Sequence, residues 1–105
     1  MTARKRLPNR RASETFAFVC GGMNYVATVS LFDNGSLAEI FLTNGKVGSD
    51  TDAAARDSAV VCSLALQHNT PVETIRKALL RDLRGAASSP LGTALDLIVG
   101  DRDAS

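Results

Sequence analysis

The sequence has two cysteines, one histidine and no long apolar run, so it offers little from which to build disulfides, metal sites or membrane spans. No apolar run approaches the roughly 20 residues that a transmembrane helix requires, so we expect no membrane segment. The basic first residues are not followed by an apolar stretch, which argues against a secretory signal. Cys20 and Cys62 are isolated and far apart, a pattern typical of neither a disulfide framework nor a metal site. We therefore expect two buried thiols, no metal, no other cofactor and a reducing, cytoplasmic location.

The only histidine, His68, offers no catalytic site. It stands at the predicted end of a helix, where a histidine commonly binds the last backbone carbonyls. No serine and aspartate accompany it in an arrangement that would activate a nucleophile. We therefore assign no catalytic residue.

Length and composition predict one small domain. The chain has 105 residues, of which 45% are apolar and 22% charged, enough to build one modest core. It is too short for a large catalytic barrel. We expect a flexible basic arm over residues 1–12, a single domain over residues 13–100 and a polar tail over residues 101–105.

Positive charge is concentrated at the start of the chain. The first eleven residues hold five basic residues and no acid, whereas acids exceed bases in the remainder. Such an arm can contact the phosphates of a nucleic acid or an acidic protein partner. The alternative is a solvated leader without a partner. The candidate contact residues are Arg4, Lys5, Arg6, Arg10 and Arg11.

Three segments alternate between apolar and polar residues, which predicts strands over residues 14–20, 25–32 and 37–43. A Gly-Gly turn separates the first two, and the Asp-Asn-Gly sequence at 33–35 is a strong hairpin signal. Consecutive strands joined by short turns pair antiparallel, so a three-stranded meander is expected. Both faces of the second strand are fairly apolar.

Helical patterns follow the strands. Residues 52–67 are rich in alanine and leucine around most of the helix, which predicts a largely buried helix capped by Asp50, Thr51 or Asp52. The last of three expected helices runs from Pro90 to about Val99 and is ended by Gly100.

The helix between them is expected over residues 70–83. Thr70 is the predicted N-cap, Pro71 suits the first turn, and Glu73 completes a capping box. Val72, Ile75, Leu79 and Leu83 would face inward, while Arg76, Lys77, Arg81 and Arg84 would form a solvated face. Strands followed by helices predict an α+β domain, with three helices packed on one face of the sheet.

The segment between the last strand and the first helix, LTNGKVGSD, has the general look of a phosphate-binding loop. It lacks the Gly-x-x-x-x-Gly-Lys-Ser/Thr spacing of a P-loop. A helix N-terminus can still bind an anion, and the candidate loop residues are Gly45, Lys46, Gly48 and Ser49. Asp50 and Asp52 at the same helix end would repel phosphate, which favours a structural turn.

Three blocks carry a family resemblance in the same order and spacing: LPNRR, NGSLAEIFLTNGKVGSD and SLALQHNTPVETIRKAL. Together they resemble the TSCPD domain of adenosylcobalamin-dependent ribonucleotide reductases, which also occurs as a stand-alone small bacterial protein. The resemblance covers about residues 7–84. The Thr-Ser-Cys-Pro-Asp string itself is missing, with only Ser88, Ser89 and Pro90 similar to it, so no role tied to that string carries over.

The resemblance implies a non-catalytic accessory domain, connected with deoxyribonucleotide metabolism or its regulation. Its protein partner would be a reductase or a related enzyme. The residues leave two alternatives: a small nucleotide- or phosphate-binding protein that uses the 45–49 loop, and a nucleic-acid-binding module that uses the arm. Because a three-stranded sheet leaves an edge or a face uncovered, we also expect a homodimer.

Overall fold

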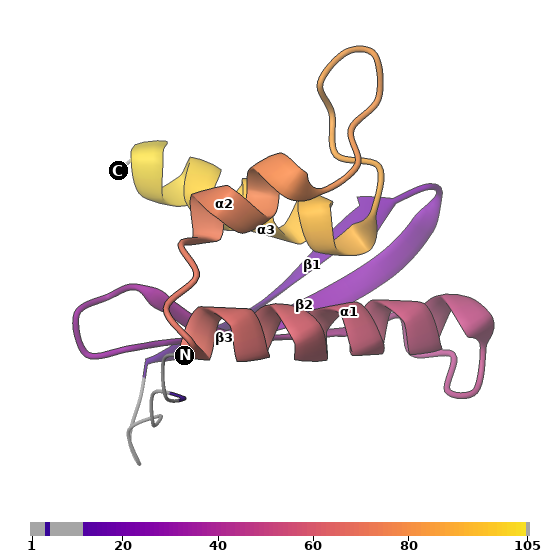
Figure 1. The fold of residues 1–105 in the computed structure, drawn as a ribbon. Helices are drawn as coiled ribbons and strands as arrows, with labels where there is room; N and C mark the ends of the chain where they lie inside the picture. Colours follow the sequence, from indigo (N-terminus) through magenta and orange to yellow (C-terminus); the bar gives the residue numbers. More distant parts are fainter. Residues whose placement is uncertain (1–3, 5–11, 105) are drawn as a thin grey trace.

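The computed structural model describes Arg4 and residues 12–104, with side chains described as far as residue 100. Three strands precede three helices along the chain (Figure 1). None of the helices in this part of the chain is long and apolar enough to cross a membrane. The elements are β1 (Ser13–Cys20), β2 (Met23–Leu31), β3 (Leu37–Thr43), α1 (Asp50–Gln67), α2 (Val72–Ala78) and α3 (Pro90–Ala104).

The sheet is the predicted antiparallel meander, with the strands in the order β1-β2-β3. Gly21 and Gly22 both have positive φ, 59° and 76°, so the first hairpin closes through a two-residue turn that other residues adopt at a cost. In the second turn Gly35 has φ 85°, and the Asn34 side chain accepts a hydrogen bond from the Ser36 amide. The two turn signals read from the sequence are therefore confirmed.

One face of the sheet carries the core. Phe18 and Tyr25 stack with ring centroids 5.6 Å apart, and Ala27, Val29 and Leu42 continue the apolar layer. Helices α1 and α3 lie over this layer (Figure 1). They contribute small and branched side chains to the core. The α+β architecture is therefore confirmed. The helical residues that complete the core are Ala55, Ala59, Cys62, Leu66, Leu91, Ala94, Leu95 and Ile98.

Helix α1 runs along β3, the last strand of the sheet (Figure 1). Its Ser63 hydroxyl bonds both the amide and the carbonyl of Ile40, each at 2.9 Å, and Gln67 donates to the Ala38 carbonyl at 3.1 Å. The helix therefore satisfies the outer edge of β3 with two of its own side chains.

The expectation that α1 is buried around most of its circumference is wrong. Val60, Val61 and Leu64 are exposed, because the helix lies at the edge of the sheet and is covered from one side only. Its N-cap is Ser49, whose hydroxyl accepts from the Asp52 amide, rather than any of the three predicted residues. The buried stripe is instead Asp52, Ala55, Ala59, Cys62, Ser63, Leu66 and Gln67.

The other two helices also differ from the prediction. Helix α2 ends at Ala78, and Pro71 occupies its N-cap without a side-chain capping bond, so Thr70 is not the cap. Helix α3 continues through Gly100 to Ala104 instead of stopping near Val99. An exposed glycine weakens a helix by only about 1 kcal/mol, which the flanking turns of α3 can offset.

Candidate interaction site

The loop between β3 and α1 is built around a buried aspartate. Asp52, 1% exposed, accepts from the Asn44 amide at 2.9 Å, the Thr43 hydroxyl at 3.0 Å and Arg56 Nε at 2.6 Å. The Asn44 amide, followed by Arg56 and Thr43, lowers the pKa of Asp52 in spite of its burial. Arg56 also donates to Thr43 at 3.0 Å and stacks 5.1 Å from the Phe41 ring centroid. The aspartate thus ties the end of the strand to the start of the helix.

The candidate anion-binding residues lie in this loop, and most of their amides already have acceptors. The Gly45 amide donates to Thr43 Oγ1, the Lys46 amide to Asn44 Oδ1 and the Ser49 amide to the Lys46 carbonyl. Gly45 and Gly48 have φ 79° and 87°, which suits a sharp change of chain direction. Nucleotide binding here stays a prediction, and it would require some of these hydrogen bonds to break.

One residue of the basic arm is placed against the domain. Arg4 Nε donates to Oε1 of the buried Gln67 at 2.5 Å, beside a cleft of about 370 Å³ that Phe41, Val60 and Leu64 line. The other four candidate arm contacts, Lys5, Arg6, Arg10 and Arg11, lie outside the described residues. Nucleic-acid binding by the arm therefore also stays a prediction.

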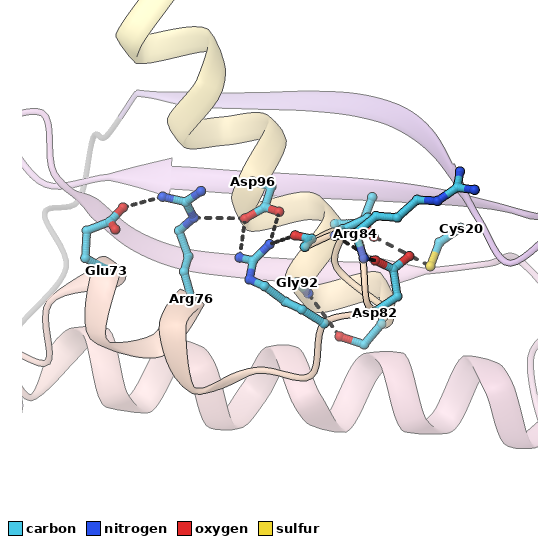
Figure 2. A network of polar contacts seen from close by, with 12 residues as sticks. Cys20, Glu73, Arg76, Asp82, Arg84, Gly92 and Asp96 are labelled. Carbon is cyan, nitrogen blue, oxygen red and sulfur yellow. Dashed lines mark hydrogen bonds and ion pairs between the residues drawn. The ribbon is translucent and has the colours of Figure 1, made fainter.

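A network of ion pairs holds the segment that joins α2 to α3 (Figure 2). Arg81 makes two hydrogen bonds of 2.8 Å to the Asp96 carboxylate, and Arg76 Nε adds a third at 3.0 Å. Arg76 also pairs with Glu73 on its own helix. Bonds from Arg81 and then Arg76 lower the pKa of Asp96 to about 2, against the opposing effect of partial burial. Arg76 and Arg81 are therefore not the solvated residues that the sequence predicted.

The same segment, residues 79–89, forms a hairpin-like turn that we call the α2–α3 loop. Arg81 and Ala87 pair across it, and the Asp82 side chain accepts from the amides of Arg84 and Ala86 at 2.8 and 3.0 Å. Gly85 has φ 84°, its amide donates to the Asp82 carbonyl, and its own carbonyl accepts from Arg81. The loop is therefore ordered by its own hydrogen bonds and anchored to α3 (Figure 2).

This ordered loop displays apolar side chains to solvent. Leu83 is fully exposed and Leu80 is 75% exposed, with the side chains of Arg84 and Lys77 also exposed nearby in the chain. The prediction that Leu83 faces the core is wrong, because the helix ends at Ala78, five positions before Leu83. One signal in the sequence could have revealed the turn. Asp82 followed by Gly85 is the typical first and fourth position of a type I turn.

The start of α3 completes the surroundings of the loop. Ser89 Oγ accepts from the Gly92 amide at 3.1 Å and so caps the helix, and Pro90 is its first residue. Next to Gly92, Thr93 donates to the Cys20 sulfur at 3.6 Å, which links α3 to β1 (Figure 2). The segment that resembles the family string therefore acts here as a helix start.

The remaining candidate groups have structural positions. Cys62 is buried, and desolvation raises its pKa to about 11, while Cys20 is half-buried. His68 caps α1, and its Nδ1 lies 2.8 Å from the Leu64 carbonyl oxygen, as predicted. Within the part of the chain that the structure describes, no three His, Cys, Asp or Glu residues are grouped so that they could hold a metal ion.

Comparison with known proteins identifies similar sequences. A family model described as the TSCPD domain matches residues 2–99. The vitamin B12-dependent ribonucleotide reductase of Streptantibioticus cattleyicolor is 34% identical over 71 residues, 68% of this chain and 12% of that protein. The proteins of the same name from Bradyrhizobium diazoefficiens and Rhodopirellula baltica are 32% and 33% identical, over 70% and 69% of this chain and 6% and 7% of their own lengths. No solved structure gives a significant match.

Proposed function

Because the chain belongs to the TSCPD domain family, we propose that it is a non-catalytic accessory module that binds a protein of ribonucleotide reduction. The observation that carries the proposal is the match to vitamin B12-dependent ribonucleotide reductases over about two thirds of this chain. The chain spans only 6–12% of the length of these relatives. A module of this size supports a large enzyme by contact, through assembly or regulation, rather than by its own turnover.

The α2–α3 loop is the surface best suited to such a contact. A fully exposed leucine lowers solubility and does nothing for the stability of the fold, yet Leu83 stands at the tip of a loop held by the Asp96 ion pairs. A loop that is ordered before binding loses less conformational entropy when a partner docks. The combination of order and apolar exposure is what a binding site for another protein requires.

The chemistry of the loop indicates the partner surface. Leu80 and Leu83 would enter an apolar pocket, since burying a leucine side chain contributes about 1.5–3 kcal/mol. Arg84 and Lys77 bring positive charge to the border of this apolar surface. Asp82 is also exposed, but one of its carboxylate oxygens accepts the hydrogen bonds from the Arg84 and Ala86 amides within the turn. We therefore expect a partner pocket that is apolar at its centre and acidic at its border.

A binding titration tests the proposal. The full chain is titrated with a purified vitamin B12-dependent ribonucleotide reductase from the same cell, and affinity is measured by calorimetry. Leu83→Ala should weaken binding about tenfold or more, from the lost apolar burial. Val47→Ala is the matched control, because Val47 is 85% exposed on the β3–α1 loop and should leave affinity unchanged.

Each result has a distinct meaning. If the wild-type chain shows no binding to the reductase, the proposed function is wrong. If it binds but Leu83→Ala binds equally well, the α2–α3 loop is not the contact. Turnover of ribonucleotides by the chain alone would overturn the non-catalytic assignment.

A further inference from the structure

The two outer strands of the sheet differ in how their edges are treated. The outer edge of β3 is occupied, because Ser63 and Gln67 of α1 bond Ile40 and Ala38 there. Strand β1, at the other side of the sheet, has five exposed residues among eight, whereas β3 has one among seven. An unoccupied edge offers a row of backbone donors and acceptors to another strand.

The hairpin geometry identifies which β1 groups face outward. A two-residue turn through Gly21 and Gly22 makes Cys20 and Met23 the closing hydrogen-bonded pair. Along β1 and β2, hydrogen-bonded residue pairs then alternate with pairs that are not hydrogen-bonded. The hydrogen bond from the Leu31 amide to the Ala12 carbonyl agrees with this alternation, because Ala12 is also an even-numbered position. The even-numbered residues of β1 therefore bond to β2. The N–H and C=O groups of Ser13, Thr15, Ala17 and Val19 point away from it.

We propose that this β1 edge pairs antiparallel with the β1 edge of a second copy of the chain, joining two three-stranded sheets into one six-stranded sheet. Natural edges that avoid pairing carry lysine, proline or a bulge. Strand β1 has no lysine or proline, and its register to β2 is continuous from Ser13 to Cys20. The outward-bonding positions hold only Ser, Thr, Ala and Val, which are small or β-branched and uncharged.

The strand is complementary to itself. With the two-fold axis at Ala17, Thr15 lies opposite Val19 of the second copy, and the three outward pairs exchange about six backbone hydrogen bonds. The only charged side chain of β1, Glu14, then lies opposite Cys20 of the second copy. The two Glu14 carboxylates are about 20 Å apart, which leaves no repulsion between them.

The side chains beside this edge also favour a second copy. Ala17 pairs with Val26 across β1 and β2, and both lie on the sheet face that carries exposed residues. Pairing at Ala17 continues this row from one copy to the next as Val26-Ala17-Ala17-Val26. Val19, which is 62% exposed, would pack beside Thr15 of the second copy.

Proline at position 17 tests the pairing. The Ala17 amide points outward, so Ala17→Pro removes it without breaking a β1–β2 hydrogen bond. We expect sedimentation equilibrium to give a dimer for the wild type and at least about tenfold weaker association for Ala17→Pro. Ala17→Val is the matched control, since it keeps the amide and should remain a dimer. A wild type that stays monomeric at high concentration, or an Ala17→Pro variant that dimerises equally well, would overturn the proposal.

Two further measurements serve if Ala17→Pro does not fold. Val19→Lys places a charge at the exposed edge, and we expect it to fold and to weaken the dimer. Amide hydrogen exchange of the wild type should show protection of Thr15, Ala17 and Val19 that rises with protein concentration. Concentration-independent exchange refutes the pairing. Protection that arises only when a reductase is added would mean that the edge receives a partner strand instead of a second copy.

Discussion

Replacing Asp96 with asparagine is expected to destabilise the domain without changing its shape. Asparagine has nearly the same size as aspartate but no negative charge. The carboxylate receives two hydrogen bonds from Arg81 and one from Arg76, and these bonds attach the α2–α3 loop to α3 (Figure 2). The substitution removes the carboxylate that pairs with Arg81, while Arg76 keeps its ion pair with Glu73.

The magnitude follows from the pKa of the carboxylate. Its pKa falls from an ordinary value of 3.8 to about 2 in the folded protein. Each unit corresponds to about 1.4 kcal/mol of preferential stabilisation of the charged form, which sets an upper value of about 2.5 kcal/mol. The Asp96 side chain is 28% exposed, so solvent screening reduces this figure. We expect Asp96→Asn to lower the free energy of unfolding by about 1–2 kcal/mol at pH 7.

The pH dependence has a definite sign. A carboxylate with a lowered pKa stabilises the folded state fully above its unfolded pKa, and this contribution is lost as the pH falls toward the folded pKa. The difference in unfolding free energy between the wild type and Asp96→Asn should therefore be constant above about pH 5. It should shrink between about pH 4 and pH 2.

Urea unfolding followed by circular dichroism at several pH values measures this difference. Asp57→Asn is the control, because Asp57 is exposed on α1, and its effect should stay within about 0.5 kcal/mol. A difference for Asp96→Asn below about 0.5 kcal/mol at pH 7, or one that is equal at pH 7 and pH 2, would refute the reasoning.

Three other outcomes are expected. Ser63→Ala should lower the unfolding free energy by about 1–3 kcal/mol, because the buried Ile40 amide loses its acceptor. Urea denaturation measures this change, and an unchanged free energy would mean that another group bonds the amide. Cys62 should react with iodoacetamide at pH 8 far more slowly than Cys20, because burial raises the pKa of Cys62 to about 11. Peptide mass spectrometry compares the two reaction rates, and equal rates would contradict the burial of Cys62. Leu83→Ala should change the free energy of unfolding, measured by thermal denaturation, by less than about 0.5 kcal/mol, because the side chain contacts solvent. A larger loss would place Leu83 in the core.

The sheet was predictable because its signals are local. Alternating side chains place Phe18, Tyr25 and Leu42 on one face wherever the chain is extended, and glycines at positive φ specify both hairpin turns. The family resemblance was likewise carried by contiguous blocks of sequence. These features need no knowledge of distant residues.

The candidate interaction site was not predictable in the same way. Every residue from Leu79 to Leu83 is compatible with a longer helix, and the apolar spacing suggests an inward Leu83. The chain leaves the helix and forms an anchored turn in which Arg81 reaches Asp96, 15 positions along the chain on another helix. An ion pair between separate elements has no periodicity in sequence, so local patterns cannot indicate it.

The polar residues of α1 show the same division between local and long-range information. Small and branched residues at helical spacing were enough to place a helix after the third strand. Ser63 and Gln67 look out of place on its buried stripe until β3 lies beside them and supplies the backbone groups that they bond. Amphipathic patterns select which segments become strands and helices, because each segment must bury one face. Within the described residues, contacts between positions far apart in the chain decide that the β3 edge is satisfied by α1 and that the β1 edge is not, and these contacts exist only after the elements have packed together.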